Sequence, residues 1–364
     1  MSQRIPCTVI TGFLGAGKTT LIQHLLRNPE GRRIALIINE FGDIGVDGDL
    51  IASCGITGCA DDDVIELANG CICCTVADDF IPTLTKLIER DRRPDHIVIE
   101  TSGLALPQPL LRAFAWPEVR AAVTVDGVVA VVDSEAVAAG RFAADPDAVA
   151  RQRAADESLD HESPLHELFE DQVSCADLIV LSKSDLVDRA TLDRVSATVA
   201  AEKRSAAKIV QSGERKPPAS VLLGLGIGAE TDAEHRRSHH EAHHHNMNHD
   251  DDDQHGDDHA DHGHDAFESF VIELAAPVEA QNLIARVSAA GTREGVLRIK
   301  GFAEVPGKPM RLVVQAVGPR VETYFDRPWR DADARPGRLV VIGLAGLDRA
   351  ALAGLLSGNA RVAR

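Results

Sequence analysis

The 364-residue sequence is short of three things that mark whole classes of protein. It has no apolar run of about 18 residues that would cross a membrane, because Asp, Glu or Gly interrupts every such stretch. Positive charge is scarce, with 38 Lys and Arg against 56 Asp and Glu, and the net charge of −18 argues against partners such as nucleic acid or an anionic membrane. A secretory leader is missing ahead of the first motif, so we expect a soluble, cytoplasmic protein.

Regularly spaced cysteine pairs are also missing. The seven cysteines are an odd number, and three of them fall within four positions, unlike the disulfide framework of a small secreted domain. This usage favours metal or redox chemistry. The chain is long for a single core, so we expect a domain of roughly 200 residues followed by a smaller one.

The most specific motif is a phosphate-binding loop near the N-terminus. Residues 12–19 match the eight-residue pattern of nucleoside-triphosphate P-loops without a mismatch, between an apolar run at 7–10 and a helical pattern. Glycines in such a loop let backbone N–H groups turn toward phosphates at a helix N-terminus. Lys18 adds a positive charge and Thr19 a Mg²⁺ ligand. The predicted nucleotide-binding residues are Gly12, Gly15, Ala16, Gly17, Lys18, Thr19 and Thr20. A plain glycine-rich turn is the competing interpretation.

Continuous apolar, β-branched runs predict a mainly parallel sheet covered by helices on both faces, an α/β fold. The runs are residues 7–10, 34–38, 96–99, 128–132, 178–181 and 208–210. Ligands bind at the carboxyl ends of such strands. Glu100 directly follows the third run, so we expect it to hold Mg²⁺ and its water and to act with Lys18 in catalysis, with the Gly103 N–H on the γ-phosphate. A solvated strand cap is the alternative for Glu100.

The segment Ser182-Lys183-Ser184-Asp185 resembles the guanine-reading element Asn-Lys-x-Asp of GTPases. A carboxylate at Asp185 accepts two hydrogen bonds from guanine, at N1–H and the 2-amino group, whereas adenine offers an acceptor at N1 and no 2-amino group. Lys183 can lay its aliphatic stem along the base. Ser182 stands where these elements usually carry Asn. The prediction is GTP in preference to ATP, and an ordinary turn with a capping Asp is the alternative.

Three thiols, Cys71, Cys73 and Cys74, lie within four residues. Adjacent cysteines make a strained disulfide, whereas close thiolates converge readily on a soft or borderline metal ion, so we predict a transition-metal site. Glu40 is a further candidate metal ligand. Cys54 and Cys59 are either a second ligand set or incidental loop thiols, and Cys7 and Cys175 are expected in the core.

Four segments together resemble the CobW family of GTPase metallochaperones: residues 12–20, 39–43, 69–74 and 100–105. The resemblance covers nearly the whole chain, and residues 75–80, 161–164 and 300–309 are similar to the family's cobalamin-biosynthesis branch. It implies a cytoplasmic GTPase that binds Mg·GTP, loads Co²⁺ on the Cys-x-Cys-Cys motif and supplies it to the cobalt-inserting chelatase of the cobalamin pathway, with slow hydrolysis timing release. The alternatives are a zinc metallochaperone of the same family and a small-molecule kinase with structural thiols.

The expected domains are a P-loop GTPase domain over residues 1–228, a disordered linker over 229–266 and a small α+β domain over 267–364. Eleven of the fifteen histidines lie between His235 and His264, interleaved with Asp, so the linker is either a metal store or a plain spacer. Beyond it, strands are expected at 270–274, 296–302, 312–317 and 338–342, with helices at 278–290 and 348–356. No catalytic constellation is visible there, which favours partner docking or metal transfer.

Overall fold

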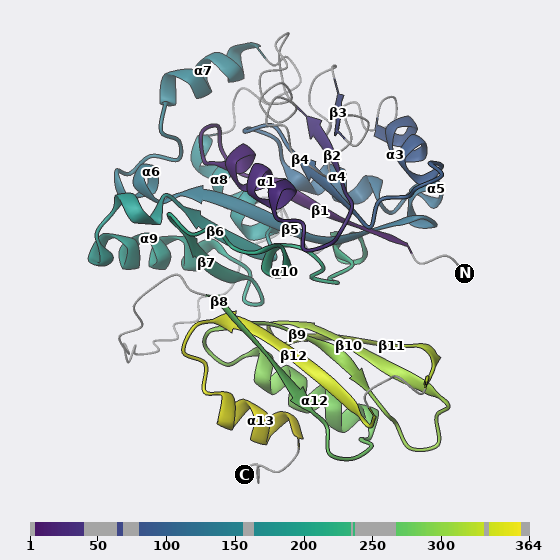
Figure 1. Cartoon of the computed structure of the whole chain (residues 1–364). Helices are drawn as coiled ribbons and strands as arrows, with labels where there is room; N and C mark the ends of the chain where they lie inside the picture. The colour runs from purple at the N-terminus through teal and green to yellow at the C-terminus, as the bar shows by residue number, and fades with distance from the viewer. Residues whose placement is uncertain are drawn as a thin grey trace, which may run out of the picture.

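The computed structural model describes residues 4–39, 64–67, 80–155, 164–233, 236, 267–330 and 335–357. These residues form two separate sheets, each with its own helices (Figure 1). Across the described ranges no helix combines the length and the apolar character needed to cross a membrane. Both the α/β class of the first part and the α+β class of the second, predicted from the sequence, are confirmed.

The first sheet is parallel throughout, with seven strands in the order β3-β2-β4-β1-β5-β6-β7. Its strands are β1 (Ile5–Thr11), β2 (Ile34–Asn39), β3 (Val64–Leu67), β4 (His96–Glu100), β5 (Val123–Asp133), β6 (Leu178–Ser182) and β7 (Lys208–Ser212). Because all strands run the same way, their carboxyl ends share one edge. The P-loop follows β1 at that edge, next to the ends of β4 and β5.

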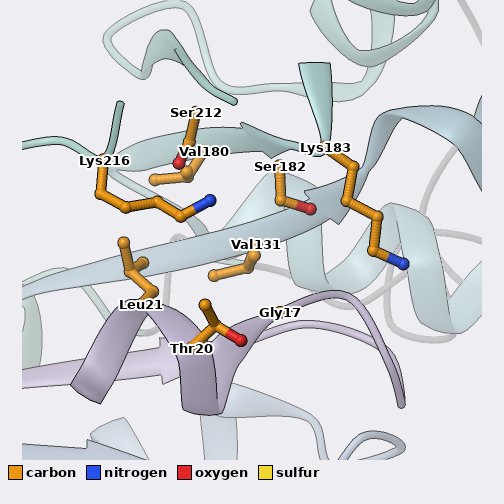
Figure 2. Close-up of a pocket in the computed structure, with 9 residues that line it drawn as sticks. All are labelled: Gly17, Thr20, Leu21, Val131, Val180, Ser182, Lys183, Ser212 and Lys216. Atoms are coloured by element: carbon orange, nitrogen blue, oxygen red, sulfur yellow. The ribbon is translucent and has the colours of Figure 1, made fainter. Parts of the chain in front are cut away.

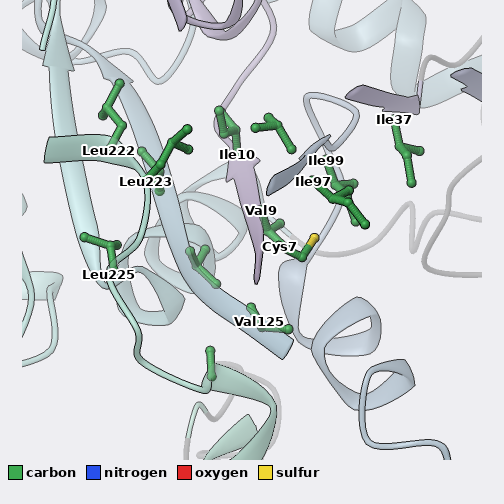
Figure 3. Close-up of a cluster of buried hydrophobic side chains, with 14 of the residues drawn as sticks. Cys7, Val9, Ile10, Ile37, Ile97, Ile99, Val125, Leu222, Leu223 and Leu225 are labelled. Carbon is green, nitrogen blue, oxygen red and sulfur yellow. The ribbon is translucent and has the colours of Figure 1, made fainter. Parts of the chain in front are cut away.

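Helices cover both faces of this sheet, as its apolar strands require. They are α1 (Lys18–Arg27), α3 (Ile81–Ile88), α4 (Pro107–Ala113), α5 (Pro117–Arg120), α6 (Ser134–Ala138), α7 (Pro146–Ala155), α8 (Leu165–Cys175), α9 (Arg189–Glu202) and α10 (Ala219–Leu222), with 3-10 turns η3 (Ser184–Leu186) and η4 (Ala229–Thr231). Alternate residues of a strand serve different faces: Val131 packs with α1, and Val132 packs with α8 and α9. Figure 3 shows part of the cluster that contains Val131, which includes Val9 and Ile10 of β1 together with Leu222 and Leu223.

The second sheet is antiparallel, in the order β11-β10-β9-β12-β8. Its strands are β8 (Phe267–Glu273), β9 (Val296–Ala303), β10 (Met310–Val317), β11 (Arg320–Pro328) and β12 (Gly337–Leu344). Helices α12 (Ala280–Gly291) and α13 (Arg349–Ser357) pack on the face turned away from the first domain (Figure 1). Strand β11 is absent from the sequence expectations because it is an edge strand with half-exposed, alternating residues rather than an apolar run.

The other face of the second sheet packs against the first domain. The buried Arg298 of β9 donates from Nη1 to the Leu223 carbonyl at 2.7 Å, and Val317 and Ile342 belong to the same apolar cluster as Leu222. Beneath this contact lies a buried polar group built on Asp126 of β5. Its carboxylate accepts from the backbone N–H of Leu225 at 2.8 Å and of Gly226 at 2.7 Å. The two domains therefore meet through ordered hydrogen bonds as well as apolar packing.

Two residues of the first domain complete that polar group. The Thr8 hydroxyl lies 3.3 Å from Asp126 Oδ2 and 2.8 Å from His96 Nε2. His96 starts β4 and is almost completely buried. The cluster lies at the amino ends of the strands, opposite the edge that carries the P-loop.

The described start of the expected linker is packed rather than solvated. Residues 229–231 form η4, and Ala229 and Ala233 are buried in the main core. Arg236 has a fully buried side chain that donates to both Asp177 oxygens at 2.9 Å, to Asp232 Oδ1 at 2.7 Å and to the Cys175 carbonyl at 2.7 Å. The counterion Asp177 is 59 residues away in sequence, so the composition around Arg236 did not predict its burial.

Candidate functional site

The P-loop connects β1 to α1 and depends on two glycine conformations. Gly12 has φ +139°, and a Cβ there would lie 2.2 Å from the Val131 carbonyl oxygen, so no other residue fits without moving β5. Gly17 has φ +98° at the N-cap of α1. The loop thus turns left-handed just before the helix, which leaves the first N–H groups of α1 directed out of the loop.

Lys18 bends back over this loop. Its Nζ donates to the Gly12 carbonyl at 2.8 Å and to the Phe13 carbonyl at 3.2 Å, and the side chain is buried. The ammonium is thereby held at the mouth of the loop, beside the N-terminus of α1. A positive charge and a row of backbone donors in one concave turn form a site for phosphate groups.

Glu100 and Thr19 meet on the neighbouring side. Parallel pairing sets Glu100 of β4 opposite Ile10 of β1, and Thr19 Oγ1 donates to Glu100 Oε1 at 3.2 Å. Hydroxyl and carboxylate oxygens are the ligand types that Mg²⁺ prefers, so this pair fits the predicted magnesium. Among the described residues nearby, the buried hydroxyls of Thr11 and Ser102 have no hydrogen-bond partner within the protein, which is typical of a site that receives a polar ligand.

Gly103 lies directly against the P-loop. A Cβ on Gly103 would lie 2.6 Å from the Leu14 backbone nitrogen, so its own backbone can approach the loop only because it has no side chain. The Gln172 amide, from α8, donates to the carbonyls of Gly103 and Ala105, both at 3.2 Å. The segment predicted to contact the γ-phosphate is therefore held in place by a buried side chain.

The element predicted to bind guanine follows β6 on the opposite side of the P-loop. The Ser182 hydroxyl lies 2.6 Å from the Ala16 carbonyl and 3.0 Å from the Val132 carbonyl, so the residue that replaces Asn ties this element to the P-loop. Lys183 has φ 52° and pairs with the buried Asp133 carboxylate at 2.5 Å. Asp185 is exposed, and its carboxylate lies beside Gly213.

A pocket lies between these two elements (Figure 2). It is bounded by the start of α1, by the ends of β5, β6 and β7, and by the loop after β7. The lining residues are Gly17, Thr20, Leu21, Val131, Val180, Ser182, Lys183, Ser212 and Lys216. Ser212 and Lys216 were missed in the sequence; the only signal was that they follow the sixth apolar run at the same sheet edge.

The predicted transition-metal ligands, Cys71, Cys73 and Cys74, lie outside the described residues, as do Glu40 and the pair Cys54 and Cys59. Their placement stays a prediction. The part of the chain that the structure does describe contains no cluster of three His, Cys, Asp or Glu side chains suited to a metal ion.

The two remaining cysteines are buried, as predicted. Burial raises the pKa of the Cys7 thiol well above its usual value and that of Cys175 to about 12. Both thiols therefore stay protonated at neutral pH, which leaves them unsuited to binding metal.

Two family models match the chain. Residues 6–211 match the CobW/HypB/UreG nucleotide-binding domain, and residues 267–359 match the cobalamin synthesis protein cobW C-terminal domain. The chain belongs to the CobW family. The first match runs from β1 to β7 and includes the P-loop, Glu100 and the Ser182–Asp185 element, and the second match begins with β8.

CobW relatives match along nearly the whole length. "Zinc chaperone CobW" of a Sinorhizobium species is 55% identical, over 96% of this chain and 95% of its own. A protein of the same name in Pseudomonas aeruginosa is 52% identical, over 97% and 91%. "Zinc chaperone YjiA" of Escherichia coli is 30% identical, over 96% and 98%. These names give no support to the expectation of cobalt as cargo, and they agree with the zinc alternative.

Proposed function

We propose that this member of the CobW family is a GTP-dependent zinc chaperone, which binds Mg·GTP at the P-loop, holds Zn²⁺ on Cys71, Cys73 and Cys74, and releases it when GTP is hydrolysed. The observation that carries the proposal is the full-length similarity to two zinc chaperones at 55% and 52% identity. The arrangement of Lys18, Thr19 and Glu100 around the P-loop supports the proposed binding of Mg·GTP. Thiolates support the metal part, because Cys-rich sets are the usual ligands of Zn²⁺. Zinc therefore replaces cobalt as the proposed cargo, and a role in cobalamin synthesis is no longer the main interpretation.

The chain's own residues would promote hydrolysis mainly by positioning and charge. The Lys18 ammonium and the loop N–H groups would neutralise charge that develops on the β- and γ-phosphate oxygens, and the Gly103 N–H would add a donor on the γ side. Thr19 and Glu100 would hold the magnesium, which would supply further positive charge to the phosphate oxygens. Asp185 would select guanine by accepting its N1–H and 2-amino group.

The path of the chain supports coupling between nucleotide and metal. Strand β3 ends at Leu67, at the same sheet edge as the P-loop. Its Glu66 is paired with Ile38 of β2, which is paired in turn with Glu100 of β4. Two strand spacings of about 4.8 Å put the Glu66 backbone roughly 10 Å from that of Glu100. The thiol segment begins a few residues later, at Cys71, so we infer that γ-phosphate contacts and thiolate geometry influence each other.

The recipient of the metal is a further part of the proposal. With zinc as cargo, the partner would be a protein that requires zinc, in place of the cobalt-inserting chelatase that the family resemblance implied. The described residues of the C-terminal domain contain no group of His, Cys, Asp or Glu suited to a metal ion, so docking such a partner is the role that we assign to it. No specific observation favours the small-molecule kinase.

Metal titration with and without nucleotide tests the proposal. Zn²⁺ should bind more tightly with Mg·GTP than with Mg·GDP or no nucleotide, by about 5–150-fold, the ordinary range of such coupling. A parallel Co²⁺ series, read from the thiolate charge-transfer band, measures metal preference. The matched control is Cys54→Ser/Cys59→Ser, which should keep the coupling that Cys73→Ala/Cys74→Ala abolishes. Equal zinc affinity in all three nucleotide states would refute the coupling, and tighter binding of Co²⁺ than Zn²⁺ would refute the choice of metal.

A further inference from the structure

The pocket beside the P-loop contains two lysines with different surroundings. The Lys183 ammonium is held by the buried Asp133 carboxylate at 2.5 Å and points away from the pocket in Figure 2. The Lys216 ammonium points inward, between Leu21 and Val180. Of the two lysines that line this pocket, Lys216 is therefore the one directed at a ligand inside it.

Lys216 is held where it is by its own loop. Its Nζ donates to the Gly213 carbonyl at 2.6 Å, which uses one of its three N–H donors. Residues 216 and 217 also lie against His24 of α1, whose ring donates a hydrogen bond to the Pro217 backbone. Burial lowers the pKa of His24, and the nearby Lys216 charge lowers it further. The ammonium thus sits on an ordered loop that leaves donors facing the pocket.

Gly213 also connects Lys216 to Asp185. A Cβ on Gly213 would lie 3.0 Å from Asp185 Oδ1, and the Lys216 ammonium donates to the Gly213 carbonyl, so the carboxylate and the ammonium both lie close to this one glycine. Guanine presents its 2-amino group, N1–H and O6 in a row along one edge. If the carboxylate takes the first two, the acceptor O6 comes next in the row, on one side of it.

We propose that Lys216 determines nucleotide specificity by donating a hydrogen bond to O6 of guanine. The inference rests on the proposed binding of GTP and adds a second reader to it. Asp185 would accept hydrogen bonds from N1–H and the 2-amino group of guanine, and Lys216 would donate one to the neighbouring O6. Adenine has an amino group at the position of O6, so it would set donor against donor and leave the ammonium without an acceptor in a partly desolvated pocket.

The test compares bases that differ in one atom, as diphosphates so that hydrolysis does not intervene. 6-Thio-GDP keeps N1–H and the 2-amino group but has a sulfur, a weak acceptor, in place of O6. IDP keeps O6 and lacks the 2-amino group. The wild-type protein should bind GDP about tenfold more tightly than 6-thio-GDP, equivalent to about 1.4 kcal/mol. Lys216→Met should bring that ratio close to one while leaving the GDP-to-IDP ratio unchanged.

Two further variants keep the result interpretable. Lys216→Arg restores donors and should recover most of the preference for GDP over 6-thio-GDP. Lys203→Met is the matched control, because Lys203 also donates to a loop carbonyl, that of Arg204 at 3.2 Å, but does not line the pocket; it should bind every nucleotide as the wild type does.

Two outcomes would overturn the role of Lys216 alone, and a third would also overturn the proposed GTP specificity. If Lys216→Met weakens GDP, 6-thio-GDP, IDP and ADP by one common factor, the lysine contacts phosphate or ribose instead of the base. If the GDP preference over 6-thio-GDP is unchanged in Lys216→Met, the lysine does not read O6. Equal wild-type affinity for GDP and ADP would overturn the proposed GTP specificity together with this inference.

Discussion

Arg236 gives the sharpest prediction about stability. Its side chain is completely buried and its partner Asp177 is only 5% exposed, so the pair is far from solvent. The guanidinium makes two bonds to that carboxylate, one to Asp232 and one to the Cys175 carbonyl. Arg236→Met keeps most of the volume and removes all four. Breaking one side of a buried ion pair costs about 3–5 kcal/mol. The partly exposed Arg204 guanidinium, 3.6 Å from Asp177 Oδ1, would remain and offset part of the carboxylate charge.

The assay is urea unfolding followed by fluorescence. The chain has two tryptophans, Trp116 in the first domain and Trp329 in the second, so a Trp329→Phe background follows the domain that contains Asp177. The free energy of unfolding of that domain should fall by about 3–5 kcal/mol in Arg236→Met. The matched control is Arg189→Met, which breaks an i,i+4 pair with Asp193 whose side chains are both 56% exposed and should cost at most about 0.5 kcal/mol.

A double variant checks the cause. Adding Asp177→Asn to Arg236→Met removes the buried carboxylate charge and keeps an oxygen for the Val128 N–H, which donates to Asp177 at 2.9 Å. Part of the lost stability should return. An Arg236→Met protein whose stability stays within about 0.5 kcal/mol of the Arg189→Met control would refute the reasoning.

Three further predictions concern the nucleotide site, pH and the linker. Lys18→Ala should remove most of the affinity for GTP measured by calorimetry, because the phosphates lose their nearest cation, whereas Lys203→Ala should not; retained affinity would contradict the site. Burial lowers the pKa of His96 from 6.5 to about 4, so the unfolded chain binds a proton that the folded chain excludes, and stability should rise as pH increases from about 4 to 6.5. His96→Gln should remove about 3 kcal/mol of that rise in urea titrations, and an unchanged profile would refute the assignment. Deleting residues 237–264 should lower the total zinc capacity measured by titration and spare the tight GTP-dependent site; loss of the tight site would contradict this and show that the segment supplies ligands to it.

Sequence reasoning identified candidate site residues where the chemistry is contiguous or ends a strand. The P-loop is a run of consecutive residues, and Glu100 ends an apolar strand, so both could be proposed before the fold was known. The parallel sheet followed from buried strands without alternation. Strand β3 was missed because Glu66 interrupts its short apolar run.

The residues that sequence reasoning missed or misjudged owe their positions to contacts with residues distant in sequence. Lys216 faces the pocket only because the loop after β7 packs on α1, and no motif marks it. Arg236 looked solvated beside a charged tract, yet its counterion lies 59 residues earlier in a buried turn. The role of Ser182 likewise depends on a carbonyl 166 residues away. Such contacts are set by tertiary packing and leave no local trace.

Strand β4 joins two regions that have been described separately. Its first residue, His96, contacts the polar group under the domain boundary, and its last, Glu100, contacts Thr19 at the nucleotide edge. Four steps of about 3.3 Å separate them, roughly 13 Å. Because β4 is hydrogen-bonded to β1 on one side and β2 on the other, it bends little. If nucleotide binding displaced Glu100 along the strand axis, His96 would therefore move by nearly the same distance. The displacement would then be felt at the boundary with the C-terminal domain.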